Sequence, residues 1–160
     1  MSFATLEEIQ SFLFKEADAA DESRFDDWFA LWASEGDILY WVPAGSDDVD
    51  PKKQLSIVYD NRSAIDDRVF RFKSKAAHAL RPPPRMRRII GNVVIESQSE
   101  ASVKVRANMI LAEVRRGTQD VLNGRVIYDL VRENGELRMV GKKVLLINNN
   151  EYIDNLSFLM

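Results

Sequence analysis

The sequence predicts an α+β fold in which three helices pack against one face of a curved antiparallel sheet. Two observations lead to this prediction: apolar residues recur with a helical period in the first half of the chain, and alternate with a period of two from Arg85 onward. A triple proline at 82–84, which no regular helix accommodates, separates the two halves. With 160 residues and no internal repeat, the chain is expected to form one domain, residues 1–160.

Two helices are predicted near the start of the chain. Over residues 5–19 the apolar side chains fall on one stripe and most charged side chains lie off it, which indicates an amphipathic helix. After a polar break at 21–23, four aromatic residues follow the spacing i, i+3, i+4, i+7, so a second helix with a deeply packed face is predicted. The first stripe consists of Leu6, Ile9, Phe12 and Leu13, and the aromatic face consists of Phe25, Trp28, Phe29 and Trp32.

A strand and a third helix are predicted before the prolines. Residues 36–43 hold a run of β-forming side chains between a glycine and a proline, too short for a helix, and residues 44–53 have the composition of an exposed loop. The third helix is expected to begin at Ser63, with Asp66 as a weak capping box, and to run to about Ser74. Its apolar face carries Ile65, Val69 and Phe72.

Four long antiparallel strands are predicted after the prolines. The alternation is clearest at 102–111, and similar runs occupy 86–98, 121–132 and 137–148. Polar residues near 97–100, Gly117 and the hairpin signal Asn134-Gly135 separate the runs. The apolar face of the clearest strand carries Val103, Val105, Ala107, Met109 and Leu111.

Composition argues against several classes of protein. No apolar run approaches the roughly 20 residues of a membrane span. A membrane is therefore not an expected partner. The formal net charge of −3 provides no general attraction to the phosphate backbone, so nucleic acid is not an expected partner either. The first residues lack the basic and apolar regions of a signal peptide, and the chain has no cysteine, so a cytoplasmic location is expected.

The shortage of histidine and cysteine, the usual protein ligands of redox metals, argues against redox metal chemistry in this chain. His78 is the only histidine and there is no cysteine. A Rieske cluster takes two Cys and two His, and a mononuclear facial-triad iron takes two His and a carboxylate. The acidic residues at 47–50 lack the pattern of a calcium loop. We therefore expect no metal site, no cofactor site and no catalytic residue in this chain.

Two surface features are candidates for subunit contacts. The basic run of Arg85, Arg87 and Arg88 could meet acidic groups of a partner, because guanidinium groups form forked bonds to carboxylates. The apolar tail with Leu156 and Phe158 would be a liability if exposed, so it is a second candidate.

Besides a role in subunit contacts, a second hypothesis places an active site inside the fold. A curved sheet closed by helices can leave a pocket in its mouth, and a stand-alone isomerase, dehydratase or cyclase could work there by acid–base chemistry. A third hypothesis is an adaptor domain that belongs to no enzyme. The cavity candidates are Trp28, Trp32, Tyr40, His78 and Tyr128, and for the aromatic residues core packing is the default explanation.

Nine short segments follow one another along the chain in a characteristic order. They are 12–17 (FLFKEA), 28–31 (WFAL), 40–43 (YWVP), 55–62 (LSIVYDNR), 67–71 (DRVFR), 84–88 (PRMRR), 91–93 (GNV), 142–146 (KKVLL) and 155–158 (NLSF). Their order resembles that of the small (beta) subunits of aromatic-ring-hydroxylating dioxygenases, the benzoate type most closely, and the resemblance spans nearly the whole chain. One departure is Arg88, at a position where many members of that family have His.

The resemblance implies a cone-shaped fold similar to nuclear transport factor 2 and to cystatin. It also implies a small-subunit homotrimer beneath three catalytic large (alpha) subunits, which would hold the Rieske [2Fe-2S] cluster and the mononuclear Fe(II). Electrons would come from NADH through a reductase, and the complex would hydroxylate aromatic compounds during their degradation. The chain itself would then supply stability and geometry, which agrees with its lack of metal ligands.

Overall fold

The computed structural model describes residues 2–160 except 46–49, 51, 54, 79–83 and 150–157. The helices are α1 (Leu6–Asp21), α2 (Phe25–Phe29) and α3 (Arg62–His78). The strands are β1 (Leu39–Pro43), β2 (Ser56–Asp60), β3 (Arg85–Gln98), β4 (Ser102–Arg115), β5 (Thr118–Glu133) and β6 (Glu136–Leu146).

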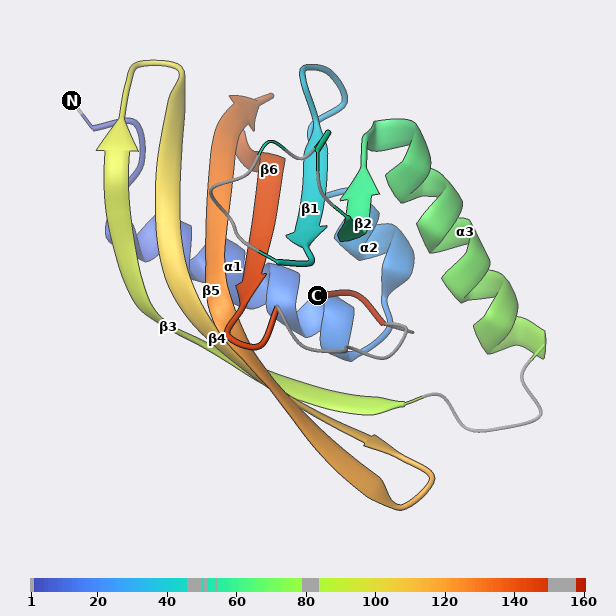
Figure 1. Ribbon diagram of the computed structural model, residues 1–160. Coiled ribbons are helices and arrows are strands. Elements are labelled where there is room, and N and C mark those ends of the chain that lie inside the picture. Colours follow the sequence, from blue (N-terminus) through green and yellow to red (C-terminus); the bar gives the residue numbers. More distant parts are fainter. Residues whose placement is uncertain (1, 46–49, 51, 54, 79–83, 150–157) are drawn as a thin grey trace.

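The strands form one curved sheet in the order β2-β1-β6-β5-β4-β3. Four of the five strand pairs are antiparallel, and the pair of β1 with β6 is parallel. Figure 1 shows α1 crossing one face of the sheet and α3 lying beyond its β2 edge. The predicted α+β architecture with three helices and a curved sheet is therefore confirmed.

The predicted first helix is α1, and its start has the complete capping box. The Thr5 hydroxyl accepts a hydrogen bond from the Glu8 backbone N–H at 3.1 Å, and the Glu8 carboxylate accepts one from the Thr5 N–H at 2.9 Å. These bonds satisfy backbone donors that have no partner inside a helix. Ile9 and Leu13 are fully buried against the sheet, whereas Leu6 stays 44% exposed.

The second helix is shorter than predicted. It ends at Phe29, so Trp32 lies beyond it rather than on its fourth aromatic position. The reason is a tertiary hydrogen-bond pair: Ala33 N–H donates to the Met139 carbonyl at 2.9 Å, and Met139 N–H donates to the Leu31 carbonyl at 2.8 Å. Pairing with β6 replaces the helical bonds that these backbone groups would otherwise make.

The third helix and the strand before it also differ from the prediction. Asn61 rather than Ser63 caps α3, because the Asn61 side-chain oxygen accepts a bond from the Ala64 N–H at 3.0 Å. The helix continues past Ser74 to His78. The short strand β2 was not predicted, since five residues at the edge of a sheet give a weak pattern. The described residues of the expected loop at 44–53 form neither helix nor strand.

The four long strands and their turns are confirmed to within a few residues. Arg116-Gly117 and Asn134-Gly135 connect β4 to β5 and β5 to β6, and all four of these residues have positive φ, between 51° and 80°. Two-residue hairpins favour this conformation because its twist matches that of the strands. Irregularities after Gly91 in β3 and after Asp129 in β5 shift the register and help to bend the sheet.

Replacing Gly124 with alanine is expected to lower the free energy of unfolding by about 1–3 kcal/mol, the usual cost of overpacking. A Cβ at this position of β5 would lie 2.5 Å from the backbone oxygen of Leu145 on β6, so the two strands would have to separate. Gly91→Ala is the matched control, because a Cβ there meets nothing within 4 Å. Urea unfolding of both variants measures the difference, and equal losses of stability would contradict the prediction.

Candidate functional site

An aromatic cluster fills the space between the helices and the sheet. The ring centroids of Trp28 and Trp32 are 5.7 Å apart, and that of Tyr40 lies 5.7 Å and 6.0 Å from them. All three side chains are almost completely buried. The cluster joins α2, the segment that follows it and β1.

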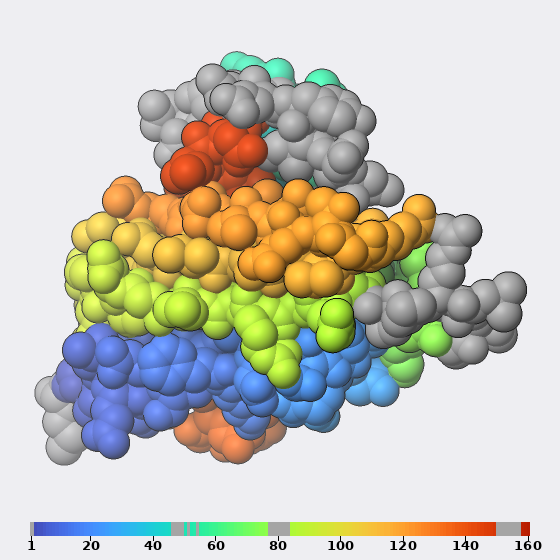
Figure 2. Space-filling view, turned by 90° about the horizontal axis from the view of Figure 1, so that it is seen from below, coloured from blue at the N-terminus to red at the C-terminus, as the bar shows by residue number. Residues whose placement is uncertain are grey.

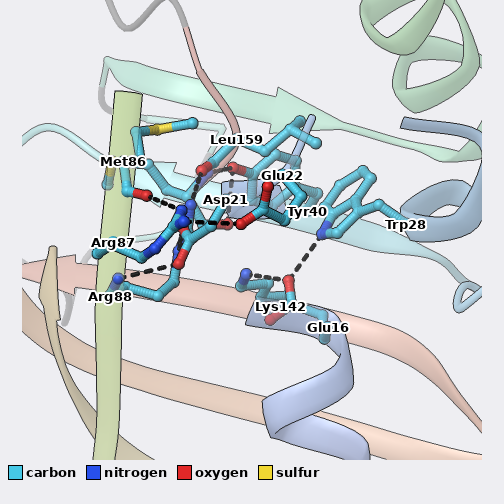
Figure 3. A network of polar contacts seen from close by, with 11 residues as sticks. Glu16, Asp21, Glu22, Trp28, Tyr40, Met86, Arg87, Arg88, Lys142 and Leu159 are labelled. Atoms are coloured by element: carbon cyan, nitrogen blue, oxygen red, sulfur yellow. Dashed lines mark hydrogen bonds and ion pairs between the residues drawn. The ribbon is translucent and has the colours of Figure 1, made fainter. Parts of the chain in front are cut away.

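A buried ion pair lies beside this cluster. The Lys142 ammonium on β6 is 2.5 Å from Glu16 Oε1 on α1, and both side chains are at most 1% exposed. Trp28 Nε1–H donates to the same oxygen at 2.7 Å (Figure 3). Because a buried charge is costly unless it is paired, the Lys142 ammonium and the Trp28 indole together stabilise the Glu16 carboxylate.

A second buried ion pair attaches β3 to the end of α1. Arg88 Nε donates to Asp21 Oδ1 at 2.7 Å, and the Arg88 backbone N–H donates to Asp21 Oδ2 at 2.9 Å. The Arg88 side chain is 0% exposed and the Asp21 side chain 6%. Figure 3 shows Arg88 between Asp21 and Leu159, whose carbonyl accepts a bond from Arg88 Nη2 at 2.8 Å.

The segment 158–160 is therefore an internal part of the fold. Phe158, Leu159 and Met160 are all buried. The Met160 N–H donates to the Tyr40 hydroxyl at 2.9 Å, and that hydroxyl donates to the Met160 carbonyl at 3.1 Å. Together with the Arg88 bond to Leu159, these contacts hold the segment inside the space between sheet and helices.

Burial shifts the protonation equilibria of the interior groups. It raises the pKa of Tyr40 to about 12, and burial together with the nearby Glu16 carboxylate raises the pKa of Tyr128 well above its usual range. Burial lowers the pKa of Lys142, and the Glu16 carboxylate opposes that shift. At neutral pH both phenols stay protonated, so neither serves as a base.

The raised pKa of Tyr40 predicts a loss of stability at alkaline pH. A group whose pKa is higher in the folded chain contributes stability that is fully present below its ordinary pKa of 10.0 and is lost as pH rises toward about 12. The full shift corresponds to roughly 2–3 kcal/mol. Urea unfolding from pH 8 to 12 should show a shallower decline for Tyr40→Phe than for the wild type or for the exposed control Tyr59→Phe. Parallel pH profiles for the three chains would contradict the prediction.

The structure separates the predicted contact residues into two groups. Arg85 and Arg87 are exposed, and Arg87 forms a surface ion pair with Glu22 at 2.9 Å. Arg88 and Phe158 are buried within the chain, where the Asp21 carboxylate pairs with the first and the core accommodates the second. Contact of these two residues with another subunit stays a prediction. Leu156 lies outside the described residues.

The predicted cavity residues are buried where the structure describes their side chains. Trp28, Trp32, Tyr40 and Tyr128 are buried in the filled interior, and the side chain of His78, the last residue of α3, lies outside the described part of the chain. Two surface hollows of about 330 and 760 Å³ lie elsewhere, the first over β1, β5 and β6 and the second between the start of β1 and the start of α3. None of these four aromatic residues lines either hollow.

Sequence reasoning missed the pair of Glu16 and Lys142. In the sequence the two residues stand out only as members of the segments 12–17 and 142–146 that carry the family resemblance. A signal was present: Glu16 follows Phe12 and Leu13 by four and three residues, so it belongs to the buried face. Its partner, however, is 126 residues away in the sequence.

The described residues contain no group of three or more His, Cys, Asp or Glu side chains arranged to hold a metal ion. None of the helices in the described part of the chain is both long and apolar enough to cross a bilayer. The interior holds two buried ion pairs and the aromatic cluster. They define a cone-shaped α+β domain whose interior is occupied by its own side chains.

Comparison with known proteins places this domain in a family. The family model described as the ring-hydroxylating beta subunit matches residues 15–152. The beta subunit of toluate 1,2-dioxygenase from Pseudomonas putida is 32% identical over 152 residues, covering 92% of this chain and 91% of the relative. The chain therefore belongs to the family of small (beta) subunits of aromatic-ring-hydroxylating dioxygenases.

Solved structures agree with this assignment. The crystal structure of the beta subunit of benzoate 1,2-dioxygenase from Burkholderia mallei matches with a TM-score of 0.81 and 29% identity, covering 97% of this chain and 99% of that one. A protein of unknown function from Nostoc punctiforme with a cystatin-like fold has a TM-score of 0.60 at 13% identity over 91% of this chain and 95% of that one, which shows the fold alone. The resemblance stated from the sequence is confirmed, and the chain is a small subunit of an oxidoreductase complex, a membership that implies a large-subunit partner.

Proposed function

We propose that this chain is the structural support on which catalytic large subunits assemble, within a complex that hydroxylates aromatic compounds during their degradation. The observation that carries the proposal is the filled interior. The segment 158–160 and the aromatic cluster are buried inside the chain, and none of their residues lines either of the two surface hollows. With the cavity filled and both buried ion pairs internally compensated, the chain offers partners its shape and its surface.

The redox groups belong to the large subunit in this proposal. A chain with one histidine and no cysteine cannot supply the two Cys and two His of a Rieske [2Fe-2S] cluster, nor the two His that a mononuclear Fe(II) requires. Electrons would reach the large subunit from NADH through a reductase. The cytoplasm, where NADH is available, is the proposed location of the complex.

The proposed assembly is a homotrimer of this chain bound to three large subunits. A closed ring of three copies requires two different surfaces on each copy that meet head to tail. The exposed arginines Arg85 and Arg87 remain proposed partner contacts, while Arg88 and Phe158 now have internal roles.

Co-expression with a Rieske-type large subunit encoded beside this chain tests the proposal. The expected result is a complex of three large and three small subunits by native mass spectrometry, and a trimer on sedimentation of the small subunit alone. Turnover should require the large subunit. A small subunit that stays monomeric at micromolar concentration would contradict the homotrimer, and aromatic turnover by the small subunit alone would contradict the structural role.

A further inference from the structure

The segment 158–160 is attached to the rest of the chain through side chains. Arg88 Nη2 donates to the Leu159 carbonyl at 2.8 Å, and the Tyr40 hydroxyl pairs with the N–H and the carbonyl of Met160 at 2.9 Å and 3.1 Å. Within the described residues the segment belongs to no helix or strand and makes no backbone–backbone hydrogen bond. A strand of the sheet is fixed by a ladder of backbone bonds to its neighbours, so this segment is attached as a bound peptide is.

The two anchoring side chains come from distant strands. Tyr40 lies on β1 and Arg88 on β3, and three other strands separate β1 from β3 in the sheet. Tyr40 is 1% exposed and the side chain of Arg88 0%. Figure 3 shows Leu159 with both anchors beside it, whereas Figure 2 shows the outer face of β3, β4 and β5 turned away from this interior. We call Arg88 and Tyr40, together with the space that residues 158–160 fill, the tail site.

Contacts outside the segment fix both anchors. Asp21 accepts hydrogen bonds from Arg88 Nε and from the Arg88 backbone N–H, at 2.7 Å and 2.9 Å. The Tyr40 ring packs against Trp28 with 5.7 Å between the ring centroids. A site whose groups are already in place loses little conformational freedom on binding. We therefore expect the tail site to stay formed when its occupant leaves.

The charges around the tail site indicate the class of ligand. Asp21 matches the Arg88 guanidinium and Glu16 matches the nearby Lys142 ammonium, so these four side chains carry no net charge (Figure 3). An anion would therefore find no uncompensated cation, whereas a neutral peptide carbonyl accepts a bond from Arg88 without disturbing either pair. Arg88 Nη1 is also buried without a hydrogen-bond partner among the described residues, so the guanidinium has one more donor than the segment uses.

The occupant itself is apolar: Phe158, Leu159 and Met160 are 7%, 1% and 0% exposed. We propose that the tail site is a binding site for a short apolar peptide, filled in this chain by its own residues 158–160, and that it accepts the same three residues from a separate peptide. A ligand on the same chain has a high effective concentration, which keeps the site filled in the wild type. The inference goes beyond the role in assembly and does not depend on it.

The test uses the full chain with Leu159→Asp, because a carboxylate at this buried position is expected to expel the segment from the interior. The probe is the synthetic peptide Ser-Gly-Ser-Phe-Leu-Met. It is expected to raise the melting temperature of the variant by roughly 3–6 °C at ten times its dissociation constant. The wild type, whose site is filled, and Ile147→Asp, altered at a residue 75% exposed, are the controls and should not respond.

Two comparisons locate the bound peptide and define its class. In the Leu159→Asp chain, Tyr40→Phe is expected to weaken peptide binding roughly fivefold, because the hydroxyl that bonds Met160 is gone. Tyr59→Phe, at a residue 47% exposed, should leave binding unchanged. Octanoate, an apolar anion without peptide groups, should produce no comparable stabilisation, and an equal effect of octanoate would overturn the proposed ligand class.

Hydrogen exchange of the wild-type chain tests the inference without any substitution. The Met160 N–H is expected to exchange at least tenfold faster than the Val126 N–H of β5, because a bound segment can leave while the sheet stays folded. Equal rates, which mean that the segment leaves only on global unfolding, would overturn the inference even if Leu159→Asp does not fold. A folded Leu159→Asp chain that does not respond to the peptide would overturn it as well.

Discussion

Arg88→Ala is expected to lower the free energy of unfolding by about 3–5 kcal/mol, because removing one member of a buried ion pair leaves the other charge uncompensated. The change would leave the Asp21 carboxylate, whose side chain is 6% exposed, without its guanidinium. It would also remove the bond that holds the Leu159 carbonyl. Urea unfolding measures the loss, and increased protease cleavage near the end of the chain would report the released segment.

The neighbouring residue Arg87 provides the matched control. Its ion pair with Glu22 has side chains 75% and 47% exposed. Exposed pairs contribute about 0–1 kcal/mol, so Arg87→Ala should leave stability nearly unchanged. Both substitutions remove one arginine from the same strand, and only the burial of the pair differs. Similar losses in the two variants would show that the Arg88 pair is not a principal contact of the fold.

The second large effect is expected at the pair of Glu16 and Lys142. Lys142→Met leaves the Glu16 carboxylate buried with only the Trp28 indole as a hydrogen-bond partner, so a loss of about 3–5 kcal/mol is expected. The double variant Lys142→Met/Glu16→Gln removes both charges and keeps an oxygen acceptor for Trp28. Most of the lost stability should therefore return in the double variant.

A thermodynamic cycle over these variants measures the coupling between the two residues. Lys104→Met is the control for the loss of a lysine, because its ion pair with Asp129 is about half exposed. Trp28 fluorescence gives an independent signal, since the indole bonds the same carboxylate. A double variant as unstable as Lys142→Met would contradict the view that charge compensation between Glu16 and Lys142 stabilises the fold.

Much of the architecture could be predicted from local pattern. The change of period after the prolines marked the boundary between helices and strands, and Asn134-Gly135 marked the hairpin between β5 and β6. These signals depend on residues within a few positions of one another. Helix ends were less accurate: Asn61 caps α3 in place of Ser63, and both residue types are good caps.

The candidate site was harder to predict, because its contacts join distant parts of the chain. The aromatic residues Trp28, Trp32 and Tyr40 were identified and do lie together. Their surroundings were not identified, since whether aromatic side chains line a cavity or fill a core depends on what else enters the space. Here Phe158, Leu159 and Met160 enter it, so the described end of a tail expected at the surface is part of the interior.

The sequence by itself determined the types of element, the principal turns and, through one histidine and no cysteine, the absence of a ligand set for redox iron. Tertiary structure alone decided that Glu16 meets Lys142, that Arg88 pairs with Asp21, and that Trp32 leaves its helix to pair with β6. The physical reason is the sequence separation over which each kind of signal acts. Periodicity and turn chemistry act between near neighbours, whereas the partner of a buried charge is set by how the whole sheet curves around the helices.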